Sequence, residues 1–414
     1  MVETHPPCPR SVLFRGRVNA RNDTFQKSSE IHPNPVSPNI MTPNQVTQRK
    51  IRYAVVGLGW FAQASALPAF AHAENSELVA LVSDDPTKRE EIAKQYGVQH
   101  TYAYDQYEDC LNSGEVDAVY IALPNHLHCE YTVRAANAGI HVLCEKPMAV
   151  TEDECQQMID ACDRNQVKLM IAYRLHLEEA NMQAVEILKS GQIGEPRIFN
   201  SVFTQQVNAG NIRVQKAVGG GTLDDIGIYC INAARYLFQA DPIEVFATAA
   251  SKDEPRFRDV AEMSSAILRF PDDQLASFTV SFGAAKTSSY QVVGTKGNLR
   301  VDPGYSGQGE IKHILTIDDK TQTQTFEGRD QLAAVFVYFS DCILQNKDPE
   351  PSGQEGLIDI RIIQALYNSI QSGRFVQLPT MQRESRPGLH QSIQRPPLEK
   401  QPELVNAADP SGQS

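Results

Sequence analysis

Residues 139–149 read GIHVLCEKPMA, and this stretch decides the fold. Its apolar run, 140–144, predicts a buried strand, and the strand must end before Pro147 because proline cannot continue it. Glu145 and Lys146 therefore stand at the carboxyl end of a strand, which is where open α/β sheets bind their ligands. The alternative is a plain turn with a surface ion pair.

Composition limits the class of protein. The chain has 414 residues, enough for two domains, and its formal net charge of −12 disfavours nucleic acid as a partner. No apolar run approaches the length of a membrane span. The eight cysteines form no Cys-x-x-Cys pair, which is typical of reduced core residues in a cytosolic protein. We expect a cytoplasmic protein with no metal site, no membrane segment and no nucleic-acid partner.

A strand-like run at 51–56 leads into a glycine motif of the form G-x-G-x-x-A. The first glycine permits a tight turn, the second lets the backbone approach a pyrophosphate, and the alanine lets a helix pack against the strand. Glycine pairs also occur in ordinary turns, but here the motif sits between a predicted strand and a predicted helix. We predict that the whole motif binds a dinucleotide: Gly57, Leu58, Gly59, Trp60, Phe61 and Ala62.

The next strand, 77–83, ends where this fold reads the ribose of the cofactor. Ser83 stands at its tip, with Lys88 and Arg89 shortly after. A hydroxyl and two cations suit a 2′-phosphate and favour NADP. Two aspartates follow Ser83 directly and could serve NAD instead, and the cations could simply be the solvated face of a helix.

Strands and helices continue to alternate up to about residue 175, which predicts a parallel, doubly wound Rossmann domain over 50–175. The fourth strand, 118–122, ends in a polar turn that supplies the cofactor candidates Pro124, Asn125 and His128. These residues could equally cap the helix that follows. Arg174, just after the strand at 168–172, completes the cofactor set together with Glu145 and Lys146.

After about residue 191 the pattern changes to successive strands joined by tight turns. We predict an α+β domain over 176–378 with a large, mostly antiparallel open sheet. Residues 1–49 and 379–414 are polar and rich in proline, and we predict that both are disordered.

The second informative stretch, 219–229, reads GGGTLDDIGIY. Asp225 and Tyr229 are four apart, so a helix would place them on one face. A lysine ammonium beside a tyrosine stabilises the phenolate form, which makes Lys146 and Tyr229 a plausible proton-transfer pair. Asp225 would accept a hydrogen bond from a substrate hydroxyl. The alternatives are that Asp225 is a helix cap and Tyr229 a half-buried core aromatic.

Together, Gly57-Leu58-Gly59, Glu145-Lys146-Pro147 and the pair Asp225 and Tyr229 resemble the glucose-fructose oxidoreductase / inositol dehydrogenase (GFO/IDH/MocA) family over residues 51–378. The resemblance implies a cis Pro147 and a Lys146 close to the nicotinamide. Most members have histidine in place of Tyr229, and the tyrosine is similar to the glucose-fructose oxidoreductase branch. In that branch the tyrosine is the acid/base, and Ser83 and Lys88 match its contacts to the 2′-phosphate of a tightly held NADP.

The resemblance implies an NADP-dependent oxidoreductase acting on a sugar or polyol, either of glucose-fructose oxidoreductase type or an aldose 1-dehydrogenase. It also implies a homodimer or homotetramer that pairs through the open sheet. Asp84 departs from the pattern and leaves NAD open. The alternative function is a non-catalytic dinucleotide or sugar sensor, which would have no use for the set Lys146, Asp225 and Tyr229.

Overall fold

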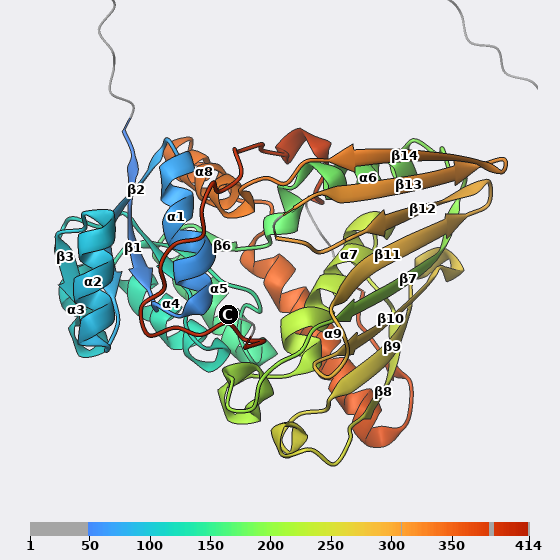
Figure 1. Ribbon diagram of the computed structural model, residues 1–414, viewed down its shortest axis with the longest axis horizontal. Helices are drawn as coiled ribbons and strands as arrows, with labels where there is room; N and C mark the ends of the chain where they lie inside the picture. Colours follow the sequence, from blue (N-terminus) through green and yellow to red (C-terminus); the bar gives the residue numbers. More distant parts are fainter. Residues whose placement is uncertain (1–48, 308, 381–384, 413–414) are drawn as a thin grey trace, which may run out of the picture. The chain divides into compact units, whose positions relative to one another are not determined.

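The computed structural model describes residues 49–307, 309–380 and 385–412. The predicted N-terminal extension therefore lies outside the described residues, except for Arg49. The first sheet has six strands in the order β3-β2-β1-β4-β5-β6 (Figure 1), and all of them are parallel, as the sequence predicts. They are β1 Ile51–Val56, β2 Ser76–Val82, β3 His100–Tyr102, β4 Ala118–Ile121, β5 His141–Cys144 and β6 Leu169–Ile171.

Helices bury both faces of this sheet. Along β1 the side chains of Tyr53 and Val55 enter one core, and those of Ala54 and Val56 enter the other, as the two-residue period of a strand requires. The second of these cores contains α3 (Tyr107–Leu111), α4 (His128–Asn137) and α5 (Glu152–Arg164). The capping box at the start of α5 is as predicted: Thr151 and Glu154 bond to each other's backbone N–H groups.

The helix α8 (Gln331–Leu344) packs on the Rossmann sheet, although it lies within the range predicted for the second domain. Phe336 sits 5.3 Å from Tyr53 and 5.2 Å from Tyr120 between ring centroids, and Ser340 hydrogen-bonds the Tyr53 hydroxyl at 2.9 Å. Together with α2 (Pro86–Tyr96) and the short α1 (Leu67–Ala69), α8 covers this face. An apolar helix pattern predicts burial but does not identify the sheet that provides it.

The second sheet has nine strands in the order β14-β13-β12-β11-β7-β10-β9-β8-β15, and only β7 and β10 pair in parallel. The mostly antiparallel prediction is confirmed. The strands are β7 Pro196–Thr204, β8 Glu244–Ala250, β9 Met263–Arg269, β10 Leu275–Ser281, β11 Thr287–Gly294, β12 Gly297–Asp302, β13 Ile311–Ile317, β14 Lys320–Phe326 and β15 Val376–Gln377. The sequence did not predict the last three. In β14 every residue except Phe326 is exposed, so the strand has no apolar alternation.

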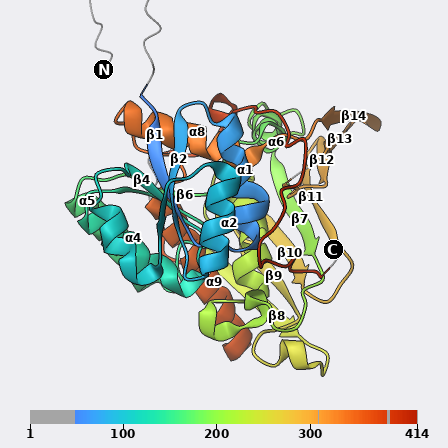
Figure 2. The same cartoon turned by 60° about the vertical axis from the view of Figure 1, so that its left-hand side comes forward.

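Helices α6 (Glu179–Lys189), α7 (Ile228–Phe238) and α9 (Gly353–Ser372) cover the inner face of this sheet (Figures 1 and 2). Side chains that alternate away from the core leave apolar groups exposed on the other face. Ile198 is 42% exposed, Val202 41%, Ile267 43% and Leu275 46%.

The predicted disorder of 379–414 is wrong for residues 385–412. This segment follows an extended path and bonds to several distant elements. Gln391, for example, is buried and donates to the His176 carbonyl at 3.0 Å. Such order comes from contacts with distant side chains, so local composition does not reveal it.

Within the described ranges, no helix is long and apolar enough to cross a bilayer. In the same ranges, no three His, Cys, Asp or Glu residues lie close enough together to hold a metal ion. Seven cysteines are free and buried, and Cys8 lies outside the described residues.

Candidate active site

The glycine motif forms the turn between β1 and the first helix. Gly57 has φ +96°, and a Cβ there would lie 2.7 Å from the carbonyl oxygen of Ala122, at the end of β4. Strand order reverses between β1 and β4, so this turn lies at the switch point where such sheets bind ligands. Gly59 is exposed, and a Cβ on it would meet no atom within 4 Å. An open glycine beside a helix N-terminus fits a pyrophosphate.

The other motif residues differ in what they can offer. The side chains of Leu58 and Ala62 are buried, with 2% and 1% of their surface exposed. Leu58 can therefore contact a ligand only through its backbone. Trp60 and Phe61 are half-buried. Gln63, which the sequence did not single out, donates from its amide to the Leu58 carbonyl at 2.9 Å and so braces the turn.

The turn after β2 brings two carboxylates and two cations together. Asp84 accepts from the Tyr104 backbone N–H at 2.8 Å, and Asp85 caps α2 by accepting from the Lys88 N–H at 3.1 Å. Both carboxylates keep further acceptor positions, so these bonds do not exclude a ribose hydroxyl. Arg89, rather than the side chain of Lys88, bonds the carbonyl of Ser83.

Asn125 and His128, in and after the turn that follows β4, contact backbone carbonyls of neighbouring segments. Asn125 donates to the Gly219 carbonyl at 2.8 Å and so joins this turn to the glycine-rich stretch of the second domain. His128 is fully buried between the carbonyls of Leu123 and Pro147, each 2.9 Å from a ring nitrogen. Burial lowers the pKa of His128. This geometry favours a structural role for His128 and leaves its predicted cofactor contact without support.

Lys146 follows the end of β5, and its peptide bond to Pro147 is cis, as the resemblance implied. Its ammonium donates to the carbonyl of Asp225 at 2.9 Å and to the carboxylate of Asp225 at 3.2 Å. Burial acts to lower the pKa of Lys146, but Tyr229 and Asp225 outweigh it, and the pKa is raised. Lys146 therefore stays charged. Glu145 points instead into the core, where it accepts from the Tyr120 hydroxyl at 2.6 Å, and burial raises its pKa.

Asp225 is a charge centre and not a helix cap. It lies in a π-helical turn, Leu223–Gly227, that has no side-chain cap. Besides Lys146, its carboxylate accepts from Arg213 at 2.9 Å and from Gln205 at 3.3 Å. Burial acts to raise the pKa of Asp225, but the two cations outweigh it and the pKa is lowered. Three of about four acceptor positions on the carboxylate are used, which leaves one for a substrate hydroxyl.

Tyr229 is held between cations and aromatic rings. The Lys146 ammonium lies 4.8 Å and the Arg174 guanidinium 5.1 Å from the centre of its ring. Phe203 and Tyr305 pack against it at 5.6 and 6.0 Å. Arg174 itself donates to the carbonyls of Tyr305 and Ser306, which fix its guanidinium beside Tyr229, and its predicted contact with the cofactor stays a prediction. A small cavity is lined by Lys146, Ala172, Tyr173, Arg174, Leu175, Ile228, Tyr229 and Asn232.

The glycine run allows the Arg213 loop to reach Asp225. A Cβ on Gly220 would lie 2.4 Å from the carbonyl of Ile212 and 2.7 Å from that of Arg213. Only a glycine at this position admits the loop so closely. Arg213 and Gln205 carried no motif signal in the sequence.

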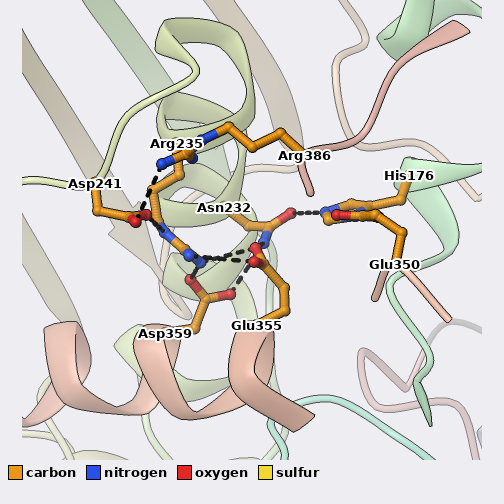
Figure 3. A network of polar contacts seen from close by, with 8 residues as sticks. All are labelled: His176, Asn232, Arg235, Asp241, Glu350, Glu355, Asp359 and Arg386. Carbon is orange, nitrogen blue, oxygen red and sulfur yellow. Dashed lines mark hydrogen bonds and ion pairs between the residues drawn. The ribbon is translucent and has the colours of Figure 1, made fainter. Parts of the chain in front are cut away.

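A buried polar network meets the cavity at Asn232, which lines it (Figure 3). The carbonyl oxygen of the Asn232 amide contacts His176 at 2.7 Å, and its nitrogen donates to Glu355 and Asp359 of α9 at 3.0 and 3.1 Å. Arg235 pairs with both carboxylates. Because all polar atoms of Asn232 are engaged, it supports the cavity wall rather than binding a ligand.

These features define a class of protein: a two-domain oxidoreductase with a dinucleotide-binding Rossmann domain and a second, sheet-based domain that completes the site. Residues 51–173 match the model of an oxidoreductase family with an NAD-binding Rossmann fold, and residues 181–300 match the GFO/IDH/MocA C-terminal domain. The chain belongs to the GFO/IDH/MocA family, as the sequence predicted.

Similar proteins include the D-xylose 1-dehydrogenase [NADP(+)] of Haloarcula marismortui, 35% identical over 340 residues, which are 80% of this chain and 94% of the relative. The structure of an aldose-aldose oxidoreductase from Caulobacter crescentus complexed with glycerol is 36% identical with a TM-score of 0.77, over 80% of this chain and 100% of that one. KijD10, a 3-ketoreductase from Actinomadura kijaniata in complex with NADP and TDP-benzene, is 28% identical with a TM-score of 0.71, over 78% and 98%.

Proposed function

We propose that this protein is an NADP-dependent oxidoreductase that acts on a hydroxyl-bearing carbon of a sugar or polyol. The observation that carries the proposal is the contact of Lys146, from the Rossmann domain, with Asp225 and Tyr229 of the second domain. A sugar substrate also agrees with the activities of two similar proteins described above, a D-xylose 1-dehydrogenase and an aldose-aldose oxidoreductase.

Each residue has a proposed part in the chemistry. The bound nicotinamide supplies or accepts the hydride. Tyr229 exchanges the proton of the substrate hydroxyl at the carbon that is oxidised or reduced. The Lys146 ammonium, 4.8 Å from the centre of that tyrosine's ring, helps to orient the substrate. Asp225 holds Lys146 and Arg213 in place and offers its remaining acceptor position to a neighbouring hydroxyl.

The cofactor preference rests on the turn after β2. Arg89 lies beside the Ser83 carbonyl and keeps further N–H donors for a 2′-phosphate, and Asp84 and Asp85 each already accept a backbone N–H. A bidentate guanidinium is well suited to a phosphate. We propose that Gly57 and Gly59 let the pyrophosphate approach the backbone, and that Lys88 adds positive charge near the ribose.

Substitution of Tyr229 tests the proposal. Tyr229→Phe keeps the ring that packs on Lys146 and Phe203 but removes the exchangeable proton. Turnover should fall by about 10²- to 10⁴-fold while NADPH still binds, because proton transfer typically contributes this much. Tyr96→Phe, on α2 away from the site, is the matched control and should turn over normally. Unchanged turnover in Tyr229→Phe would refute the assigned role.

A spectrum of the purified protein distinguishes the two modes of action. If the protein retains its cofactor and recycles it between two sugars, a reduced-nicotinamide band should grow on adding aldose with no cofactor supplied. If it is an ordinary dehydrogenase, activity should need added NADP. A sensor would bind the dinucleotide but show no turnover on any aldose or polyol, and that outcome would reject the enzymatic proposal.

We further propose that the protein works in the cytoplasm as a homo-oligomer. Seven buried free thiols suit a reducing compartment. The exposed apolar side chains of the outer sheet face, among them Ile198, Ile267 and Leu275, would be covered by a second copy. Light scattering of the wild type and of an Ile267→Glu variant tests the oligomer, because the charge should dissociate it.

A further inference from the structure

The C-terminal segment crosses the turns that hold a dinucleotide in this fold (Figure 2). Residues 404–410, here called the strap, contain no helix or strand, bend at 405–406, and lie outside both regions that match the family. The Val405 N–H donates to the side chain of Gln63 at 2.7 Å, and the Gln63 amide donates back to the Val405 carbonyl at 2.9 Å. The strap is therefore paired to a side chain that itself braces the pyrophosphate turn.

The next residue reaches the second turn. Asn406 donates to the Asp85 carboxylate at 3.1 Å, and Asp85 is the N-cap of α2, directly after the end of β2. Rossmann folds recognise the adenosine ribose at this position. Asn406 is exposed, and its amide has two N–H donors, of which one goes to Asp85. The second donor is free for a ribose or phosphate oxygen.

The end of the strap reaches the second domain. The Pro410 carbonyl accepts from the Asn208 N–H at 3.0 Å, and Pro410 is buried. Asn208 lies three residues beyond Gln205, in the same loop that brings Arg213 to Asp225. The strap thus connects both nucleotide-binding turns to the loop that completes the candidate active site.

We propose that the strap forms the outer wall of the dinucleotide site and that Asn406 is a nucleotide-binding residue at its adenosine-ribose end. The ligand class is a nicotinamide adenine dinucleotide, so this inference rests on the proposed function. The strap has no helix or strand of its own and is held by a few hydrogen bonds and the packing of Val405, and such a segment opens locally without global unfolding. Dinucleotide release then requires the strap to detach, which makes release slow.

The test measures release rather than turnover. The full chain, a truncation ending at Pro402 and the Asn406→Ala variant are loaded with NADPH and mixed with excess NADP, and the loss of bound-NADPH fluorescence gives the dissociation rate. Glu399→Ala, at an exposed position five residues before the strap, is the matched control. We expect dissociation to speed up about tenfold or more in the truncation and about fivefold in Asn406→Ala, with Glu399→Ala unchanged.

Wild-type release rates in both the truncation and Asn406→Ala would overturn the strap proposal. Thermal unfolding of each variant shows whether it is folded, and the point variant decides the question if the truncation is not. The outcomes separate the two proposals. If the full chain binds neither NADPH nor NADH, the proposed function fails, and the strap proposal fails with it. If the full chain binds and turns over but release does not depend on the strap, only the strap proposal fails.

Discussion

His176 should make the stability of this protein depend on alkaline pH. Its ring is fully buried, and its Nδ1 lies 2.8 Å from the Glu350 carboxylate (Figure 3). Burial acts to lower the pKa of His176, but the attraction of Glu350 outweighs it and raises the pKa to about 9, from 6.5 in an unfolded chain. The folded protein therefore binds more protons than the unfolded chain between these two values.

The size and sign of the contribution of His176 to stability follow from the linkage between proton binding and folding. The difference of about 2.5 pH units, at about 1.4 kcal/mol per unit, gives about 3 kcal/mol of stability. This contribution is fully present below pH 6.5 and is lost as the pH rises through about 9. Glu355, whose pKa is raised by burial to about 7, titrates at the lower edge of this window. The informative quantity is therefore the difference in the free energy of unfolding between the wild type and a variant that lacks His176.

Urea unfolding followed by circular dichroism at pH 6.5, 7.5, 8.5 and 9.5 measures this difference. His176→Phe keeps the stacking with Tyr173, 5.4 Å away, but cannot titrate. Its destabilisation should shrink by about 2–3 kcal/mol across the series. In Glu350→Gln, which removes the charge and keeps the shape, the free energy of unfolding should lose the same pH dependence. In the control His100→Phe, on the exposed strand β3, it should keep that dependence. A constant difference between wild type and His176→Phe would refute the reasoning.

Three further predictions concern the site. Gly57→Ala should lose dinucleotide binding in a fluorescence titration and about 2 kcal/mol or more of stability in urea, because of the clash with Ala122 and the positive φ. Gly114→Ala, with φ +74° but open space around its Cβ, should show only the conformational cost. Lys146→Met should lower turnover by about 10²-fold or more with NADPH still bound, and equal turnover would contradict its role. Arg89→Leu should weaken NADPH about tenfold relative to NADH in paired titrations; an unchanged ratio would remove Arg89 from the phosphate site.

The sequence predicted those parts of the fold that depend on neighbours along the chain. The turn at Gly57, the end of β5 before Pro147 and the capping box at Thr151 each need particular residues at fixed spacing. The same holds for Asp225 and Tyr229, which one helical segment carries on successive turns. The sequence also placed Lys146 at the ligand-binding end of a strand and paired it with Tyr229 on chemical grounds, but its contact with Asp225, 79 positions away, follows from no local rule.

The tertiary structure decided what depends on contacts between distant residues. Tyr53 meets Ser340, 287 positions later, which assigns α8 to the first sheet. Arg213 reaches Asp225 because Gly220 admits its loop, and the strap is ordered because Gln63 and Asp85 supply partners that its own sequence lacks. Local sequence patterns predict which residues will be buried and which will lie in turns. The partner of a buried charge or an extended segment is set by the packing of the whole chain, since only folding brings those groups within hydrogen-bond distance.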